Sequence, residues 1–402
     1  MTNNIKYNCI FGGGGIRGMC YIGAIKALKE FNIELNSIAG SSVGAVFAAL
    51  YAIGYNEDEI RDLFFDFNLN MFRDLNISIF TTDISISKGE IFLEWLREKI
   101  EKKFYGEKYK KGKNKPVKFK DISKNLFILT IDLNTNSPFI FSKESTPEEE
   151  IAFAVRASAS LPGLMKPISM GDAILVDGDL IKSWPAWKVY NSLDNSSSRI
   201  LEFRLEGSRK DRDIKNPMDY LSSIINTIWY LSTENVFNMN HTNDRYDYIV
   251  IDTKDIILFD FNIEKNIKNE LIEKGYNDTK KYLCEILPEK KKIIIENYKD
   301  ILNNLIIYKK YIKEGNIDKA FYIINDILSE MPQKTDYIDK YFYNQINDLK
   351  EILQVNTKKL FFFKQRIDNE KQIITRIEFV ENMLKERIIE LKTYITNFCN
   401  NF

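Results

Sequence analysis

The sequence predicts an α/β protein that continues into an all-helical extension. From about Lys6 to Leu180, short apolar runs alternate with longer amphipathic ones, which is typical of strands and helices in turn. From Pro288 onward there is almost no glycine or proline, and apolar residues recur at steps of three and four. A chain of 402 residues also suits one large domain with an addition. We therefore predict an α/β domain over residues 5–287 and a helical extension over residues 288–402.

The elements of the α/β part follow from hydrophobic pattern and length. Short apolar runs predict strands, and one run that is apolar all round predicts a buried helix at residues 43–55. The predicted strands are YNCIF (7–11), NSIAG (36–40), NLFILTIDL (125–133), SPFIFS (137–142), DAILVDGDL (172–180) and two within residues 244–263. The other predicted helices cover residues 19–31, 89–104 and 268–287.

Helical spacing of apolar residues predicts a bundle or helical hairpin in the extension. The positions that carry this pattern are Ile323, Ile327, Leu328, Leu349, Ile352, Leu353, Ile373, Ile377, Val380 and Leu384. The LFFF run at residues 360–363 is too apolar for an open helix face, so it is expected in the bundle core. A contact with a partner or a membrane is the alternative for that run.

Composition limits the classes of function. Lys and Arg together number 57, as do Asp and Glu, so no overall field attracts nucleic acid. The lysine-rich run at residues 102–120 is expected to be a solvated loop, with attraction to anionic lipid head groups as the alternative. No apolar run approaches the roughly 20 residues of a transmembrane helix, and the N-terminus does not resemble a signal peptide. A soluble, cytoplasmic protein is expected.

Cysteine and histidine usage narrows the chemistry. Cys9, Cys20, Cys284 and Cys399 are scattered, which favours a reducing compartment and supports no metal site or disulfide framework. The single histidine, His241, lies in a polar stretch and is expected at the surface. Catalysis by a Ser-His-Asp triad and zinc binding by histidines are therefore disfavoured.

The glycine run at residues 12–15 lies between a predicted strand and a predicted helix, where glycine is unfavourable unless bare backbone is required. A phosphate-binding P-loop is excluded because Met19 and Cys20 follow Gly18 in place of the lysine and hydroxyl. A dinucleotide fingerprint fits Gly13, Gly15 and Gly18, but the acidic residue expected after the next strand is missing. Nucleotide binding therefore stays a weak alternative.

A second glycine motif, GSSVG, follows the next predicted strand. It has the form G-x-S-x-G with Ser42 at its centre, between a short strand and a helix of small residues. A nucleophile elbow requires this context, because a sharp turn exposes the serine at the start of a helix. Gly40 and Gly44 allow neighbouring backbone to approach closely, and the helix dipole favours a developing alkoxide at Ser42.

A nucleophilic serine also needs an oxyanion hole and a base. The backbone N–H groups of Gly13, Gly14 and Gly15 are candidates for the first, with Arg17 adding positive charge; a surface salt bridge is the alternative for Arg17. For the base, the LVDGDL stretch offers Asp177, followed by a tight turn at Gly178, although most Asp-Gly pairs are merely turns.

These residues together resemble the patatin-like phospholipases, which use a Ser-Asp dyad. The family's G-G-G-x-R-G segment, G-x-S-x-G elbow and D-G-[GA] turn correspond to GGGIRG (13–18), GSSVG (40–44) and DGD (177–179). The resemblance implies Ser42 as nucleophile, Asp177 as base, and Gly14 and Gly15 with Arg17 as oxyanion donors. The segments LTIDLNTNSPFIFS (129–142), AVRASASLPGLMKPI (154–168) and GYNDT (275–279) are similar to the same family.

The resemblance implies a three-layer α/β/α domain with a mostly parallel central sheet. It further implies a lipid acyl hydrolase that cleaves esters of phospholipids or related acyl lipids at a membrane surface, without cofactor or metal. One departure is Asp179, where the family has Gly or Ala; its charge is expected to raise the pKa of Asp177, unless Asp179 faces solvent. Two alternatives remain: an inactive binding protein that acts through its helical extension, and a dinucleotide-binding protein.

Overall fold

The chain divides into two compact units. The computed structural model describes residues 5–66, 85–180, 199–207, 246–253, 263–334, 343–352 and 370–399, with a few single positions between 214 and 256. The first unit combines Met1–Val236 with Asp247–Tyr282, and the second combines Phe237–Tyr246 with Leu283–Phe402.

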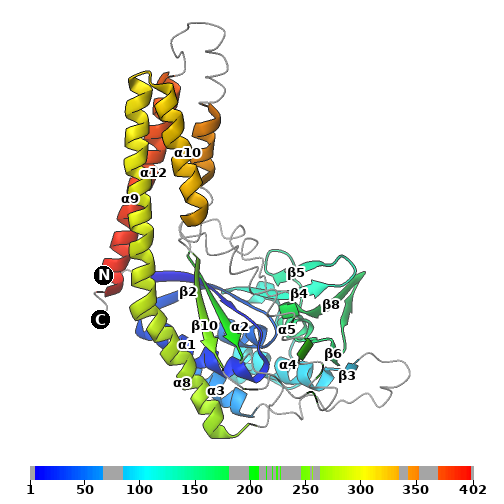
Figure 1. Cartoon of the computed structure of the whole chain (residues 1–402). Coiled ribbons are helices and arrows are strands. Elements are labelled where there is room, and N and C mark those ends of the chain that lie inside the picture. Colours follow the sequence, from blue (N-terminus) through cyan, green and yellow to red (C-terminus); the bar gives the residue numbers. More distant parts are fainter. Residues whose placement is uncertain are drawn as a thin grey trace. The chain divides into compact units, whose positions relative to one another are not determined.

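A mostly parallel sheet organises the first unit (Figure 1). Strand β1 pairs in parallel with β2 on one side and with β9 on the other, and β2 pairs in parallel with β4. The chain then adds β8, β7 and β5 in antiparallel orientation. The strand order is β10-β9-β1-β2-β4-β8-β7. The strands are β1 (Ile5–Phe11), β2 (Ile33–Gly40), β4 (Asn125–Asp132), β5 (Ser137–Ser142), β7 (Ile168–Met170), β8 (Ala173–Asp177), β9 (Arg199–Glu206) and β10 (Tyr246–Asp252).

The central strands β1 and β4 are buried on both faces, because helices cover the sheet, as is usual for parallel sheets. Phe11 of β1 packs against Tyr21 and Phe47, with ring centroids 5.0 and 4.9 Å away, so α1 and α2 lie on the same face. The helices of this unit are α1 (Cys20–Glu30), α2 (Val43–Ile53), α3 (Glu57–Asp66), α4 (Glu90–Tyr105), α5 (Ile151–Ser158) and α8 (Lys265–Lys281). A separate two-stranded sheet pairs β3 (Ser85–Ser87) with β6 (Gly163–Met165).

Two glycines let α1 and α8 approach to backbone contact. A Cβ added to Gly23 would lie 1.8 Å from the carbonyl oxygen of Ile272, and one added to Gly275 would lie 1.9 Å from that of Cys20. Both distances are far inside van der Waals contact, so a side chain at either position would force the helices apart. The GYNDT segment therefore has a packing role at this crossing.

The predicted secondary structure is confirmed in type over the described residues, with shifts at its limits. Strand β2 begins at Ile33, three residues before the predicted NSIAG run, because its first half alternates buried and exposed residues. The helix predicted to end before Pro288 continues through a π-helical turn, Tyr282–Ile286, into α9 (Leu287–Lys313). Proline is tolerated there because it occupies the first turn of α9. Most of the second strand predicted within residues 244–263 lies outside the described residues.

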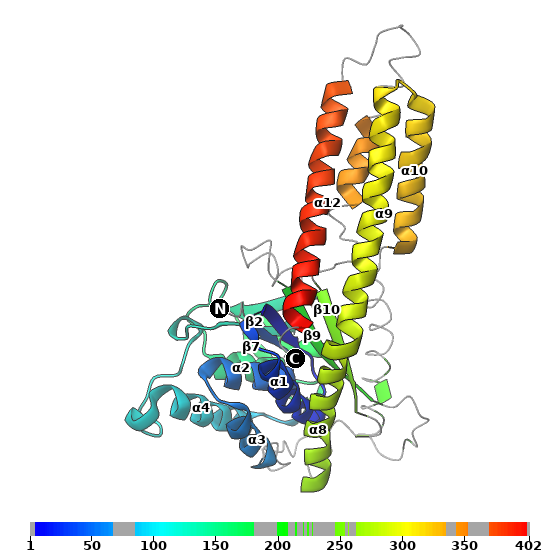
Figure 2. The ribbon, with the colours of Figure 1, turned by 90° about the vertical axis from the view of Figure 1, so that its left-hand side faces the viewer.

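The second unit is a helical bundle, as predicted. Helices α9, α10 (Ile317–Lys334) and α12 (Glu370–Cys399) run side by side with the helical residues 343–352 (Figure 2). Its core includes Ile327, Leu349, Ile377 and Leu384, all at predicted core positions. Leu353 and the LFFF run lie outside the described residues.

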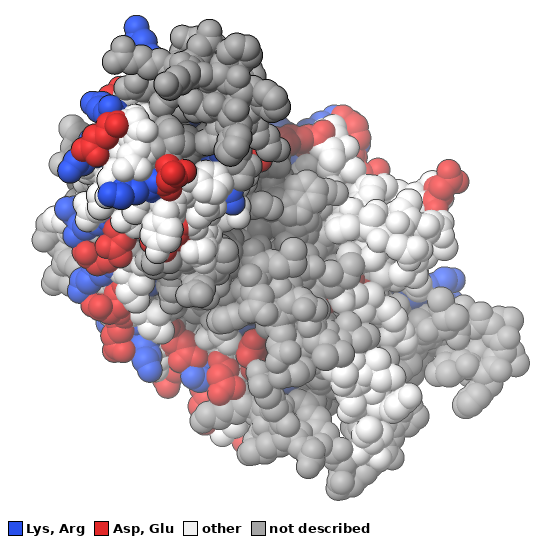
Figure 3. Space-filling model, turned by 45° about the horizontal axis from the view of Figure 1, so that its top comes forward, with Lys and Arg blue, Asp and Glu red and all other residues white. Residues whose placement is uncertain are grey.

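Charged side chains of both signs are interspersed on the face of the molecule shown in Figure 3, as far as its described residues extend. Pairs of opposite charge within the bundle, such as Lys309 with Glu378 at 2.9 Å, fit this picture. Across the described residues, no helix is both long enough and apolar enough to cross a membrane.

Candidate active site

The sheet brings the three sequence motifs to one place. In its register, Phe11 of β1 lies beside Gly40 of β2, and Gly40 lies beside Ile128 of β4. Strand β8 runs antiparallel to β4 and ends with Asp177 beside Thr130. The glycine loop after β1, the elbow after β2 and the turn after β8 therefore meet above the middle of β4, although their sequences are far apart.

The elbow holds Ser42 in an unusual backbone conformation. Its φ of 53° and ψ of −125° lie in a region that residues with a side chain rarely adopt, and such strain is concentrated at functional sites. A Cβ at Gly40 would lie 2.2 Å from the carbonyl oxygen of Gly44, and one at Gly44 would lie 2.0 Å from that of Phe11. The turn therefore requires glycine at both ends of the motif.

Ser158, at the C-terminal end of α5, supports the elbow. Its hydroxyl accepts a hydrogen bond from the N–H of Ser42 at 3.0 Å and donates to the carbonyl of Leu129 at 2.5 Å. The Ser42 N–H is thus already used and is not free to bind an oxyanion. Sequence reasoning did not single out Ser158, although it lies within the AVRASAS segment of the resemblance.

The glycine loop presents backbone N–H groups. Those of Gly13, Gly14 and Gly15 make no hydrogen bond to another described residue, whereas Gly12 N–H donates to the carbonyl of Phe203 at 3.1 Å. The Tyr21 hydroxyl of α1 donates to the Gly12 carbonyl at 2.6 Å and so holds the start of the loop in place. Gly15 has a φ of 57°, a left-handed conformation that favours glycine.

Arg17 follows the loop but is buried, with 1% of its surface exposed. Its guanidinium donates two hydrogen bonds, of 2.9 and 2.6 Å, to the carbonyl oxygen of Ile256. Because Arg17 is buried, the surface position that the alternative required is not what the structure shows. Arg17 keeps a positive charge near the loop while attaching residue 256 to it.

Asp177 lies at the end of β8 and is 1% exposed. The side chain of Ser42 lies close enough to act on the pKa of Asp177, and Asp177 Oδ1 accepts the N–H of Asp179 at 2.8 Å. Burial and the charge of Asp179 raise the pKa of Asp177 to about 7, whereas the bond from the Asp179 N–H and the nearby Ser42 side chain lower it. A carboxyl group that titrates near neutral pH suits general base catalysis. Glycine is required at position 178, because a Cβ added there would lie 2.2 Å from the carbonyl oxygen of Leu129.

Asp179 faces the interior of the site and not solvent, with 3% of its surface exposed. Its Oδ1 accepts a hydrogen bond from the Ser41 hydroxyl at 2.9 Å. Its Oδ2 is buried and has no hydrogen-bond partner among the described residues. The sequence departure therefore lies inside the motif cluster.

Other predicted features lie away from this cluster or outside the described chain. Cys9 and Cys20 are buried, and burial raises the pKa of both thiols, which makes them poor nucleophiles. No group of three or more potential metal ligands occurs within the described ranges. His241 lies outside the described residues, and so does the side chain of Cys399.

The lysine-rich run, residues 102–120, lies at the other end of α5 from Ser42. The Val117 carbonyl accepts the N–H of Ile151 at the start of α5, while Ser158 at its end contacts the elbow. At 1.5 Å per residue, these ends are about 10 Å apart. Several lysines of the run form ion pairs: Lys102 and Lys111 with Glu98, and Lys118 and Lys120 with Glu148. These observations favour solvation of the lysines, but the run is not wholly a loop, because its residues up to Tyr105 belong to α4.

Comparison with known proteins identifies the family. The family model of the patatin-like phospholipases matches residues 9–188, which include all three motifs. An uncharacterized protein of Acanthamoeba polyphaga mimivirus is 30% identical over 288 residues, which cover 70% of this chain and 94% of that protein. The chain belongs to the patatin-like phospholipase family.

This patatin-like chain is also similar to a viral protein named as a lipid hydrolase and to a solved bacterial structure. A protein of Invertebrate iridescent virus 6 named "Probable lipid hydrolase 463L" is 24% identical over 196 residues, which cover 47% of this chain and 66% of that protein. Among solved structures, VipD from Legionella pneumophila is 15% identical with a TM-score of 0.42, covering 93% of this chain and 91% of VipD. The patatin-like phospholipase family supports lipid acyl hydrolysis as the class of activity.

Proposed function

We propose that the protein hydrolyses acyl esters of phospholipids or related lipids with Ser42 as nucleophile and Asp177 as base. The observation that carries the proposal is the meeting of the elbow, which holds Ser42 at a φ of 53°, with the buried Asp177, whose pKa the neighbouring Ser42 side chain lowers. The N–H groups of Gly13, Gly14 and Gly15, unused within the described chain, supply the oxyanion donors.

In the first step, Asp177 takes the Ser42 proton as Oγ attacks the ester carbonyl carbon. The carbonyl oxygen gains negative charge, which the glycine N–H groups and the nearby charge of Arg17 stabilise. Collapse of the tetrahedral intermediate breaks the C–O bond to the leaving alcohol, and Asp177 returns the proton to that oxygen. An acyl group remains on Ser42.

In the second step, water attacks the acyl carbon and gives a proton to Asp177. Collapse of this second intermediate frees the carboxylic acid, and Asp177 returns the proton to Ser42 Oγ. Because only the ionised Asp177 accepts a proton, we expect activity to rise as the pH increases through about 7. The chemistry requires neither a metal nor an organic cofactor.

The substrate class rests on the family and on the relative named as a lipid hydrolase. Phospholipids are presented at membrane surfaces, so we propose peripheral association of a cytoplasmic protein with such a surface. We assign the chemistry to residues 5–287, and we propose residues 288–402 as the region for contact with a protein partner or activator.

The test combines turnover and labelling on folded variants. We expect Ser42→Ala and Asp177→Asn each to lower fatty-acid release from phosphatidylcholine vesicles by at least about 100-fold. A fluorophosphonate probe should label the wild type and should not label Ser42→Ala. Ser329→Ala is the matched control, because this exposed serine lies in the helical bundle, where its hydroxyl donates to the carbonyl of Asp326.

Four results would count against the proposal. Near-normal turnover by folded Ser42→Ala would refute the nucleophile, and near-normal turnover by folded Asp177→Asn would refute the base. A folded wild type with neither labelling nor turnover would favour the inactive binding protein. Tight dinucleotide binding in a thermal-shift titration would favour the remaining alternative, although the buried Asp179 carboxylate beside Gly13 opposes an anionic ligand there.

A further inference from the structure

Asp179 contacts all three segments of the candidate site. Its N–H donates to Asp177 Oδ1 at 2.8 Å, and its Oδ1 accepts the hydroxyl of Ser41, the neighbour of Ser42, at 2.9 Å. A Cβ built on Gly13 would lie 2.8 Å from the Cβ, Cγ and Oδ2 atoms of Asp179. The side chain of Asp179 therefore fills the space directly beside the first glycine of the GGGIRG motif.

We propose that Asp179 is a positioning residue that joins the turn, the elbow and the glycine loop, and that its charge sets the pH range in which the site works. The inference rests on the proposed Ser42–Asp177 function and goes beyond it. The family turn usually reads D-G-[GA], with no carboxylate at this position, so the DGD turn of this chain departs from the usual form.

The geometry makes the charge of Asp179 matter in two places. It lies against Gly13, whose N–H is a proposed oxyanion donor, so its negative charge opposes the charge that develops on the substrate oxygen. It also lies two residues from Asp177 in a buried site, where like charges disfavour ionisation of the base. Consistent with this, the charge of Asp179 is the second cause, after burial, that raises the pKa of Asp177 to about 7.

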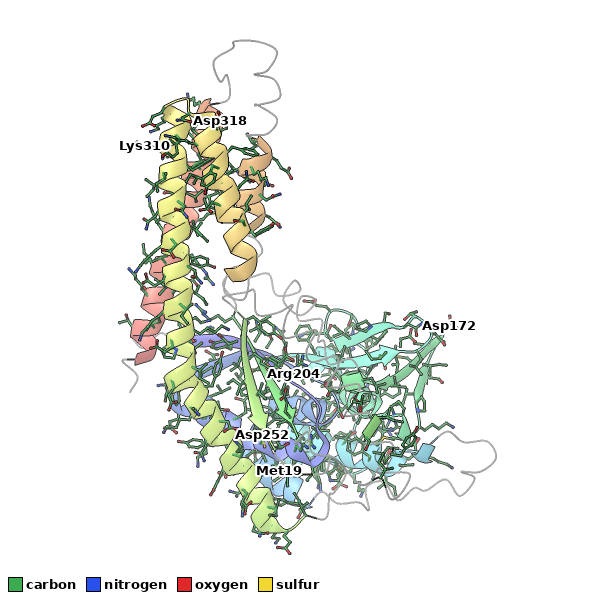
Figure 4. The ribbon with its side chains drawn as sticks, viewed as in Figure 1. Met19, Asp172, Arg204, Asp252, Lys310 and Asp318 are labelled. Carbon is green, nitrogen blue, oxygen red and sulfur yellow. The ribbon has the colours of Figure 1, made fainter. Side chains whose placement is uncertain are left out.

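Other titratable groups around Asp179 come from three elements. Tyr21 of α1 is held neutral, since burial and the charge of Asp179 raise its pKa well above the usual range. On β9, the buried Arg204 forms an ion pair with Glu202, and the charge of Asp179 also acts on its guanidinium. Tyr248 of β10 lies under the Arg204 guanidinium, 5.4 Å from ring centroid to Cζ. Figure 4 labels Arg204, which lies on β9 between β1 and the edge strand β10.

None of these neighbouring groups is among the causes that shift the pKa of Asp177, whereas Asp179 is. Among the described residues, the pKa of Asp177 is governed by burial, by Asp179 and by Ser42. Changing the charge at position 179 is therefore the direct way to move the titration of the base. Asp179→Asn keeps an oxygen to accept the Ser41 hydroxyl and keeps the backbone bond to Asp177, so it changes charge with little change in shape.

The experiment measures kcat/KM for p-nitrophenyl butyrate between pH 4.5 and 9 on the full-length chain. We expect the wild-type rate to be half-maximal near pH 7 and the Asp179→Asn rate to be half-maximal at a lower pH. At pH 5.5 about one wild-type molecule in thirty has an ionised Asp177. At this pH, the rate of Asp179→Asn, expressed as a fraction of its own plateau rate, should be at least about threefold higher than the same fraction for the wild type.

The control is Asp172→Asn, which removes one negative charge at an exposed position in the turn between β7 and β8. It should leave the pH of half-maximal rate unchanged, because an exposed charge is screened by solvent. A purely structural role for Asp179 would lower the plateau rate without moving this pH, so the pH profile separates the two roles.

The outcomes distinguish this inference from the proposed function. If Ser42→Ala is inactive and folded Asp179→Asn has the wild-type pH profile or one moved to higher pH, the role of Asp179 is refuted and the dyad stands. If Ser42→Ala keeps its turnover, the proposed function itself fails. Should Asp179→Asn not fold, Asp179→Ser provides a second neutral variant, and the same shift to lower pH is expected of it.

Discussion

Replacing Asp177 by Asn should stabilise the protein at alkaline pH while abolishing turnover. The pKa of Asp177 is about 7 in the folded protein and about 3.9 in an unfolded chain. Between these values the native state holds a proton that the unfolded state has released, so the free energy of unfolding falls as the pH rises. A pKa difference of about 3, at 1.36 kcal/mol for each pH unit, gives a loss of about 4 kcal/mol, complete above about pH 7.

Asn resembles the protonated acid and cannot ionise, so it escapes this loss. We expect Asp177→Asn to exceed the wild type in free energy of unfolding by about 2 to 4 kcal/mol at pH 8 and by little at pH 4. Urea denaturation followed by circular dichroism at both pH values measures the difference, with Asp172→Asn as the control for charge alone. An equal difference at the two pH values would refute the raised pKa of Asp177.

Two further predictions concern packing and the elbow. Gly275→Ala should lower the free energy of unfolding by about 3 kcal/mol, because its Cβ would lie 1.9 Å from the Cys20 carbonyl oxygen. The control is Gly112→Ala, at an exposed left-handed position with nothing within 4 Å, where backbone strain alone should cost about 1 kcal/mol. An equal or greater loss for Gly112→Ala in urea denaturation would contradict this packing role. Ser158→Ala removes the acceptor of the Ser42 N–H and should lower kcat about tenfold or more with little change in KM, whereas an unchanged kcat would show that the elbow holds Ser42 without it.

Much of the fold followed from local sequence signals. The strands and helices that were predicted up to Leu180 agree in type with the described structure, whereas α3, α5 and the short strands β3, β6 and β7 were not predicted. Their limits were less predictable, because a limit depends on packing. The continuation of α8 into α9 is one example, since Pro288 reads as a break in sequence but occupies a helix start in space.

The candidate site was predictable in its motifs and not in its supports. Ser42, Asp177 and the glycines are marked by spacing that their chemistry requires. Ser158 has no such mark, because its role depends on α5 ending beside the elbow. The bonds of Arg17 to Ile256 and of Ser41 to Asp179 join residues more than a hundred positions apart, so only the folded chain reveals them.

Because Gly13 and Asp179 lie in contact, the effects of substitutions at these two positions, which are distant in sequence, should depend on each other. A methyl group at position 13 would overlap the side chain at position 179, so the two residues compete for one volume. An alanine at position 13 should be less harmful once position 179 is reduced to glycine, and the two substitutions should not be additive. A side chain at position 13 would therefore be tolerated more easily after residue 179 has been replaced by a smaller one.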